Sequence, residues 1–274
     1  MKNKIILGLL SACLVISPLA TAKEKIYTFG VVPQQAANVL ANRWVPLTQY
    51  LSKRTGLTIN FATAANIPTF ETRLAENKYD IAYMNPFHYV VFSEDSDYIA
   101  IANQADKKIQ GVLVAKKESN IESIADLQNR TIAFPAPGSF AATLLPQAEL
   151  KQSQIEFTPR YVASHDSVYL SVAKEFFVAG GGVKRTLNNM PDDVRATLKV
   201  IYETQRYTPH AFAVLNTMSD EHQKTIQEAL TNMSNDPEGE AILSKLGMLR
   251  LQKAIDSDWD DVRALNLNAG AIAK

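Results

Sequence analysis

Short runs of β-branched and aromatic residues alternate with amphipathic stretches along most of the chain, and this alternation constrains the fold most. The pattern predicts a strand at Ile26–Val32, a helix at Ala36–Arg54 and a second strand at Leu57–Thr63. Further strands are predicted at Tyr79–Tyr83, Ile99–Ala102, Gly111–Lys116, Thr131–Phe134, Phe157–Val162, Val200–Glu203 and Ala211–Leu215. Strands that alternate with helices favour an α/β fold, and we expect parallel sheets covered by helices on both faces.

Proline and glycine mark several expected breaks in this pattern. Pro46 is expected to kink or restart the first helix, and Gly56 is expected to end it. The glycine run Gly180–Gly182 is assigned to no strand, and it leads into a helix expected at Lys184–Leu198. From Ser219 onward the chain is expected to be mostly helical.

Ligands of such sheets bind beyond the carboxyl ends of the strands, so four loops carry the candidate site residues. These loops are Pro33–Gln35, Tyr83–Pro86, Pro135–Ser139 and Ser164–Ser167. No internal repeat or low-complexity linker separates them, so two lobes would have to be joined by strands.

Residues 1–22 have the composition of a secretory signal peptide. Lys2 and Lys4 precede an apolar run that closes with the A-x-A pattern of residues 20–22. We therefore predict cleavage after Ala22 and a periplasmic location. A lipoprotein anchored through Cys13 is the alternative, but the apolar run continues past that cysteine, whereas a lipoprotein usually turns polar there.

The charge balance excludes nucleic acid as a partner. The chain of 274 residues has 28 basic and 28 acidic side chains, and removal of the leader leaves 26 basic against 28 acidic ones. Nucleic-acid binding would need a cationic excess. With 46% apolar residues, a chain of this length can form its core without disulfides or metals.

Enzyme signatures are largely missing from the sequence. The four histidines, at positions 88, 165, 210 and 222, form no H-E-x-x-H pair, and the only cysteine leaves with the leader. We therefore expect no metal, no cofactor and no catalytic role. An exported enzyme stays open as an alternative, and measured turnover of a phosphoester would support it.

Four segments in order resemble a known family, the phosphate/phosphite/phosphonate-type periplasmic solute-binding proteins of ABC transporters. The segments are Phe29–Gln34 followed by Trp44–Leu51, Tyr79–Pro86, Phe134–Ser139 followed by Pro146, and Ser164–Ser167. The resemblance implies a type II periplasmic-binding fold: two α/β lobes joined by two crossover strands, with the ligand in the cleft between them. It also implies a small oxyanion or organophosphorus ligand, a permease partner in the inner membrane and a monomeric protein.

The resemblance also implies the boundaries of the lobes. The chain is expected to leave lobe one near Val112 and return near Pro209. Lobe one then comprises residues 23–112 and 209–274, and lobe two residues 113–208.

The candidate ligand-binding residues come from the same resemblance: Ser139, His165, Tyr83, Gln34, Asn85, Thr143 and Ser167. Ser139 would stand at a helix N-terminus, where free N–H groups and the helix dipole favour an anion. His165 would donate to the same anion, while Tyr83 and Gln34 would reach it from the other lobe. The arginines Arg43, Arg185 and Arg206 could reach an anion, but the sequence places none of them.

Two departures from the family pattern bear on the ligand. The anion loop of the family carries two or three consecutive hydroxyl residues, whereas Phe140 and Ala141 follow Ser139 here. Val178 stands where aminophosphonate-binding members carry an acid for the ammonium group. The aminophosphonate ligand is therefore in doubt, and Phe140 is expected to make the cleft more apolar. A module that senses a non-phosphonate ligand for a membrane signalling protein stays open as the alternative function.

Overall fold

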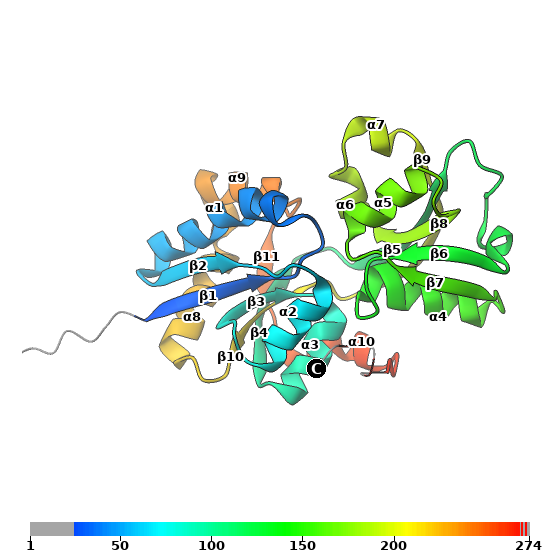
Figure 1. Ribbon diagram of the computed structural model, residues 1–274. Coiled ribbons are helices and arrows are strands. Elements are labelled where there is room, and N and C mark those ends of the chain that lie inside the picture. Colours follow the sequence, from blue (N-terminus) through cyan, green and yellow to red (C-terminus); the bar gives the residue numbers. More distant parts are fainter. Residues whose placement is uncertain (1–24, 269, 271, 273–274) are drawn as a thin grey trace, which may run out of the picture.

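The computed structural model describes residues 25–268, 270 and 272. The predicted leader and Cys13 lie outside these residues. Two separate β-sheets divide the described chain, and Figure 1 shows them side by side with helices packed around each.

The first sheet has six strands in the order β11-β4-β10-β3-β1-β2. These strands are β1 (Ile26–Val31), β2 (Thr58–Ala62), β3 (Ile81–Met84), β4 (Tyr98–Gln104), β10 (Ala211–Leu215) and β11 (Leu251–Lys253). The second sheet has five strands in the order β7-β6-β8-β5-β9. They are β5 (Ile109–Lys116), β6 (Arg130–Phe134), β7 (Phe157–Tyr161), β8 (Ala179–Val183) and β9 (Leu198–Tyr207).

Helices connect most of the strands within each sheet. Those around the first sheet are α1 (Ala37–Thr55), α2 (Ile67–Ala75), α3 (Pro86–Asp95), α8 (Asp220–Thr231), α9 (Pro237–Lys245) and α10 (Asp260–Arg263). Those of the second are α4 (Leu145–Gln152), α5 (His165–Ala173), α6 (Lys184–Asn188) and α7 (Asp192–Arg195). Short 3₁₀ turns lie at Ile124–Leu127, Met233–Asn235 and Asp256–Trp259, and a π-helical turn at Phe140–Leu144 opens α4.

The expectation of purely parallel sheets was wrong. β1 pairs in parallel with β2 and β3, but β10 runs antiparallel to both β3 and β4. In the second sheet β5 runs antiparallel to β8 and β9. Short links from the other sheet lead into β5 and β10, without the helical crossover that a parallel neighbour requires.

The chain passes between the sheets twice, through residues 105–108 and 208–210. Val112, where the sequence predicts the chain to leave lobe one, lies inside β5 of the second sheet, and Pro209 lies in the return link. We propose that the lobes follow the two sheets, with these links as the connection between them.

The glycine run forms the central strand β8 rather than a break. A Cβ atom on Gly181 would collide with the backbone carbonyl of Ala142 and lie 2.7 Å from the Phe134 ring. One on Gly182 would lie 2.6 Å from the Tyr169 ring on the opposite face. Helices thus approach this strand closely from both faces, and glycine is needed for packing although it weakens an isolated strand.

The first helix does not restart at Pro46, because α1 continues through this residue to Thr55. Its end is as predicted: Gly56 has φ of 73° and donates its N–H to the carbonyl of Ser52. The helix expected at Lys184–Leu198 is instead the two short helices α6 and α7, followed by the start of β9.

We predict that Gly181→Ala destabilises the protein by about 3 kcal/mol, because the new methyl group must push the π-helical turn off the sheet. Urea denaturation would measure the loss. Gly56→Ala is the matched control: nothing lies within 4 Å of its Cβ position, so only the left-handed backbone is strained, at a cost of about 1 kcal/mol. An equal loss in both variants would contradict the packing argument.

Candidate functional site

The predicted ligand-binding loops meet where the two lobes touch. The backbone N–H of His165, at the start of α5, donates to the carbonyl of Gln34 in the loop after β1 (3.2 Å). The side-chain amide of Asn85, in the loop after β3, donates to the carbonyl of Gly138 (3.0 Å). Strand ends of the first sheet therefore face helix starts of the second lobe, as the loop rule predicts.

Apolar packing joins the lobes beside these contacts. Phe140 is fully buried, and its ring centroid lies 5.7 Å from that of Tyr207 of the same lobe in an edge-to-face arrangement. Phe140 also belongs to the hydrophobic cluster that contains the core of the first lobe. It lines neither cavity of the cleft described below, so the expectation that it makes the cleft surface apolar was wrong.

Ser139 and His165 lie together on the second-lobe side. The Ser139 hydroxyl lies 3.5 Å from Nε2 of His165, and Thr186 at the start of α6 lies 3.2 Å from Nδ1. All three side chains are buried. Ser139 precedes the π-helical turn, but its hydroxyl accepts no hydrogen bond from a backbone N–H of that turn. The hydroxyl therefore does not serve as a helix cap.

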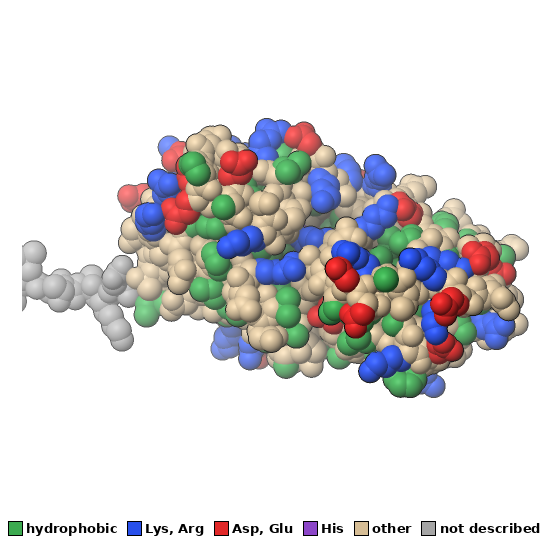
Figure 2. Space-filling model, turned by 90° about the horizontal axis from the view of Figure 1, so that it is seen from above, with side chains coloured by type: hydrophobic (Ala, Val, Ile, Leu, Met, Phe, Trp, Pro, Cys, Tyr) green, Lys and Arg blue, Asp and Glu red, His purple; other side chains and the backbone are tan. Residues whose placement is uncertain are grey.

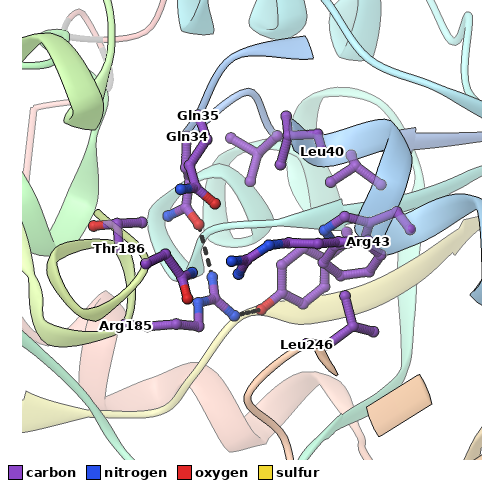
Figure 3. Close-up of a pocket in the computed structure, with 12 residues that line it drawn as sticks. Gln34, Gln35, Leu40, Arg43, Arg185, Thr186 and Leu246 are labelled. Carbon is purple, nitrogen blue, oxygen red and sulfur yellow. Dashed lines mark hydrogen bonds between the residues drawn. The ribbon is translucent and has the colours of Figure 1, made fainter. Parts of the chain in front are cut away.

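Gln34 and Tyr83 lie together on the first-lobe side, around a guanidinium from the second lobe. Arg185 donates through Nη1 to the Tyr83 hydroxyl (2.8 Å) and through Nη2 to Oε1 of Gln34 (2.7 Å), as the dashed lines in Figure 3 mark. The Gln34 amide nitrogen is 3.2 Å from Nε2 of His210, whose ring stacks on Tyr83 at 4.9 Å. One connected polar network thus spans both lobes.

A small cavity of about 20 Å³ opens beside this network. Its wall combines apolar side chains from α1 with polar groups from both lobes. The lining residues are Val31, Val32, Gln34, Gln35, Leu40, Arg43, Trp44, Tyr83, Arg185, Thr186, Asn189 and Leu246. Figure 3 shows Arg43 and Arg185 entering it from opposite sides, and no carboxylate lines it.

Burial keeps the histidines of the site neutral. Desolvation and the nearby Arg185 guanidinium lower the pKa of His165 from 6.5 to about 3. The same two causes hold the pKa of His210 well below its ordinary value. The positive charge of the site at neutral pH therefore comes from its arginines, while the histidines offer neutral N–H and nitrogen groups.

One carboxylate lies close to the site, that of Asp166 in the first turn of α5. It accepts hydrogen bonds from the Gln35 amide and the Ala36 N–H of the other lobe, each at 3.4 Å. Burial raises the pKa of this carboxyl group, and Arg43 works in the opposite direction. Asp166 thus faces the N-terminus of α1 rather than the Ser139–His165 pair.

The structure places Ser139 beside His165, and Gln34 and Tyr83 around Arg185. The two groups are linked by the bond from the His165 backbone N–H to the Gln34 carbonyl, and Ser139 and His165 line neither cavity. Asn85 borders these groups, but its Oδ1 atom caps α3 by accepting from the N–H of His88 (2.8 Å).

Two other predicted residues stay apart from the network. The hydrogen bonds of Ser167 lie at the start of α5. Its N–H donates to the hydroxyl of Ser164, and its hydroxyl is hydrogen-bonded to the same group. The Thr143 hydroxyl is fully buried and has no hydrogen-bond partner in the described part of the chain. Val178, the position of the missing acid, is 36% exposed and lines neither cavity.

The sequence left Arg185 unplaced and did not indicate Thr186 or His210 as site residues. Arg185 and Thr186 come directly after the carboxyl end of β8. Had the glycine run been recognised as a strand, the rule that pointed to Ser139 would have pointed to them as well.

Comparison with known proteins assigns the chain to a family. Residues 29–259 match the family model described as the phosphonate periplasmic substrate-binding protein of an ABC transporter. The chain belongs to this family. Its members are substrate-binding components and not enzymes, and the family is periplasmic.

Individual relatives are more distant. The phosphonates-binding periplasmic protein of Escherichia coli is 24% identical over 95% of this chain and 82% of its own length. The phosphate-import protein PhnD of Mycolicibacterium smegmatis is 23% identical over 74% of this chain and 71% of its own length.

Solved structures confirm the fold. The structure of PhnD1 from Prochlorococcus marinus in complex with methylphosphonate superposes with a TM-score of 0.81 at 21% identity, covering 88% of this chain and 98% of PhnD1. The expected periplasmic-binding fold of two α/β lobes is therefore confirmed.

None of the helices within the described residues is long and apolar enough to cross a membrane. Within the same residues, no group of three or more His, Cys, Asp or Glu side chains could hold a metal ion.

The low pKa of His165 predicts a specific loss of stability in acid. The unfolded chain binds a proton as the pH falls through 6.5, whereas the folded chain binds it only near pH 3, so stability falls across this window. Between pH 7 and pH 5 the wild type should lose about 2 kcal/mol more than His165→Gln in urea denaturation. His222→Gln, on α8 outside the cleft, is the matched control, and an equal acid loss in wild type and His165→Gln would refute the prediction.

Proposed function

We propose that this protein binds a phosphonate-type oxyanion in the cleft between its lobes and delivers it to a membrane permease. The observation that carries the proposal is the network in which Arg185 of the second lobe bonds Gln34 and Tyr83 of the first. A ligand held by such a network touches both lobes at once.

Each member has a chemical role in this proposal. Ser139 supplies a hydroxyl at the start of the π-helical turn, where backbone N–H groups and the helix dipole favour an anion. His165 donates one N–H as a neutral imidazole, and Arg185 supplies the compensating charge through its fork of donors. Hydrogen bonds to a charged oxygen contribute about 1.5–3 kcal/mol each, so a few of them suffice for tight binding.

Contacts from both lobes also explain how the protein would signal that it is loaded. A ligand that binds the closed arrangement more tightly than an open one shifts the population toward closure. A permease that recognises the closed form would then accept only the loaded protein. Export through a leader cleaved after Ala22 and a monomeric state complete the proposal.

The choice of ligand class is supported by the relatives. One is named for phosphonates, another for phosphate import, and the structure of PhnD1 holds methylphosphonate. A thermal-shift screen with phosphate, phosphite, methylphosphonate, sulfate and uncharged metabolites tests the class. At 100 times its Kd a ligand stabilises the fold by about 2.7 kcal/mol, which shifts Tm by several degrees. Shifts with neutral compounds alone would overturn the oxyanion class.

Replacement of Ser139 by alanine should weaken methylphosphonate binding about tenfold or more, because one hydrogen bond to a charged oxygen is lost. Isothermal titration calorimetry measures the change. Ser93→Ala is the control, since it deletes a hydroxyl that only bonds the Val90 carbonyl in α3 (3.1 Å). Unchanged affinity in a folded Ser139→Ala protein would remove Ser139 from the site.

We also predict that the protein discriminates against aminophosphonates. No acid lines the small cavity, and Arg43 and Arg185 would repel an ammonium group. 2-Aminoethylphosphonate should bind about tenfold more weakly than n-propylphosphonate, which has the same shape without the charge. Competition calorimetry compares the two ligands, and equal or tighter binding of the aminophosphonate would contradict the prediction.

A further inference from the structure

A second, larger cavity of about 540 Å³ lies next to the small one, on the side of the links between the lobes. Its size is that of pockets which bury drug-sized ligands. The lining residues are Tyr83, Gln104, Asp106, Lys107, Lys108, Ile109, Gln110, Val183, Lys184, Arg185, Asn188, Asn189, Arg206, Pro209, His210 and Gly247. Figure 2 shows Lys and Arg side chains gathered along the junction of the two lobes.

The wall of this second cavity is strongly cationic. Five of its side chains are Lys or Arg, and Asp106 is its only acid. Asp106 is already paired with Arg250, outside the cavity wall. Two of the cations are neutralised as well, Lys108 by Asp261 and Lys184 by Glu203.

Three cations of the wall, Lys107, Arg185 and Arg206, form no salt bridge with any described carboxylate. They come from three different segments: the first link, the start of α6 and the end of β9. Lys107 and Arg185 line the same cavity, and burial together with the Arg185 charge lowers the pKa of the Lys107 ammonium group. Like charges that converge on one cavity without counter-charges favour an anionic occupant.

The second cavity adjoins the small cavity, and Thr186 in the wall of the small cavity lies 3.2 Å from Nδ1 of His165. Arg185, Tyr83 and Asn189 line both cavities. His210 of the second cavity bonds Gln34 of the first (3.2 Å). One ligand with two separated anionic groups can therefore reach both places.

We propose that the second cavity binds a second anionic group of the same ligand, so that the protein is built for phosphonates or phosphate esters bearing a further acid group. The inference rests on the proposed function, because the phosphorus oxyanion occupies the Ser139–His165 side. Arg206 and Lys107 hold the second anionic group, and the amides of Gln104, Gln110 and Asn188 lie in the same wall. Arg185 stands between the two groups.

The experiment compares each phosphonocarboxylate with its carboxyl methyl ester. Phosphonoacetate and 3-phosphonopropionate are titrated by calorimetry, because their esters keep the chain and the phosphonate but lose the carboxylate charge. For the better of the two acids, the wild type should bind the acid about tenfold or more tightly than the ester. The preference should weaken as salt concentration rises, since the contacts are between charges.

The double variant Lys107→Gln/Arg206→Gln should bind acid and ester within about twofold of each other, because neither residue lines the small cavity. Lys151→Gln/Arg160→Gln is the matched control. It removes the same two charges from exposed positions on α4 and β7 and should keep the wild-type preference.

The outcomes separate this inference from the proposed function. If esters and methylphosphonate bind but the acids gain nothing, the second site is refuted and the oxyanion site stands. If the preference persists in the double variant, Lys107 and Arg206 do not form the site and the inference fails. If no phosphonate binds at all, both proposals fail together. Loss of preference in the double variant alone supports the second site.

Discussion

The guanidinium of Arg185 organises the cleft of this protein. It extends from the second lobe and donates to a phenol and an amide of the first, so its charge is shared with neutral acceptors and not with a carboxylate. The same charge, together with burial, lowers the pKa of His165 and of His210. A site built in this way has donors and positive potential, and no acid lines its small cavity. Its chemistry therefore favours anions and disfavours cations.

Much of the fold could be predicted from the sequence because its strands are rich in β-branched residues and its helices are amphipathic. The missing pieces were those that depend on tertiary packing. Three consecutive glycines have the local character of a loop, and only the helices pressed against both faces make Gly180–Gly182 a strand. Pro46 likewise stays inside α1, where packing overrides its local preference. β11 has three residues, too few for a periodic pattern.

As with the fold, part of the candidate site could be predicted from the sequence and part could not. Ser139 and His165 follow recognisable strand ends, and the structure places their side chains 3.5 Å apart. Arg185 follows β8, which was not recognised as a strand. The sequence therefore could not place Arg185 in the site, although arginine is a natural partner for an anion. The role of Phe140 could not be predicted either, since its burial against Tyr207 involves a residue 67 positions away. Both failures come from contacts between segments distant in the sequence.

The glycine strand β8 also bears on how the protein can move. Residues of α5 press on Gly180 and Gly182, and the π-helical turn presses on Gly181, so these helices pack directly on the backbone of β8. The freedom that remains lies in the two short links between the sheets. If ligand binding closes the lobes as proposed, dyes attached to α8 and to α7 would turn that closure into an optical signal. Under the proposed function, a protein labelled in this way would report dissolved phosphonates.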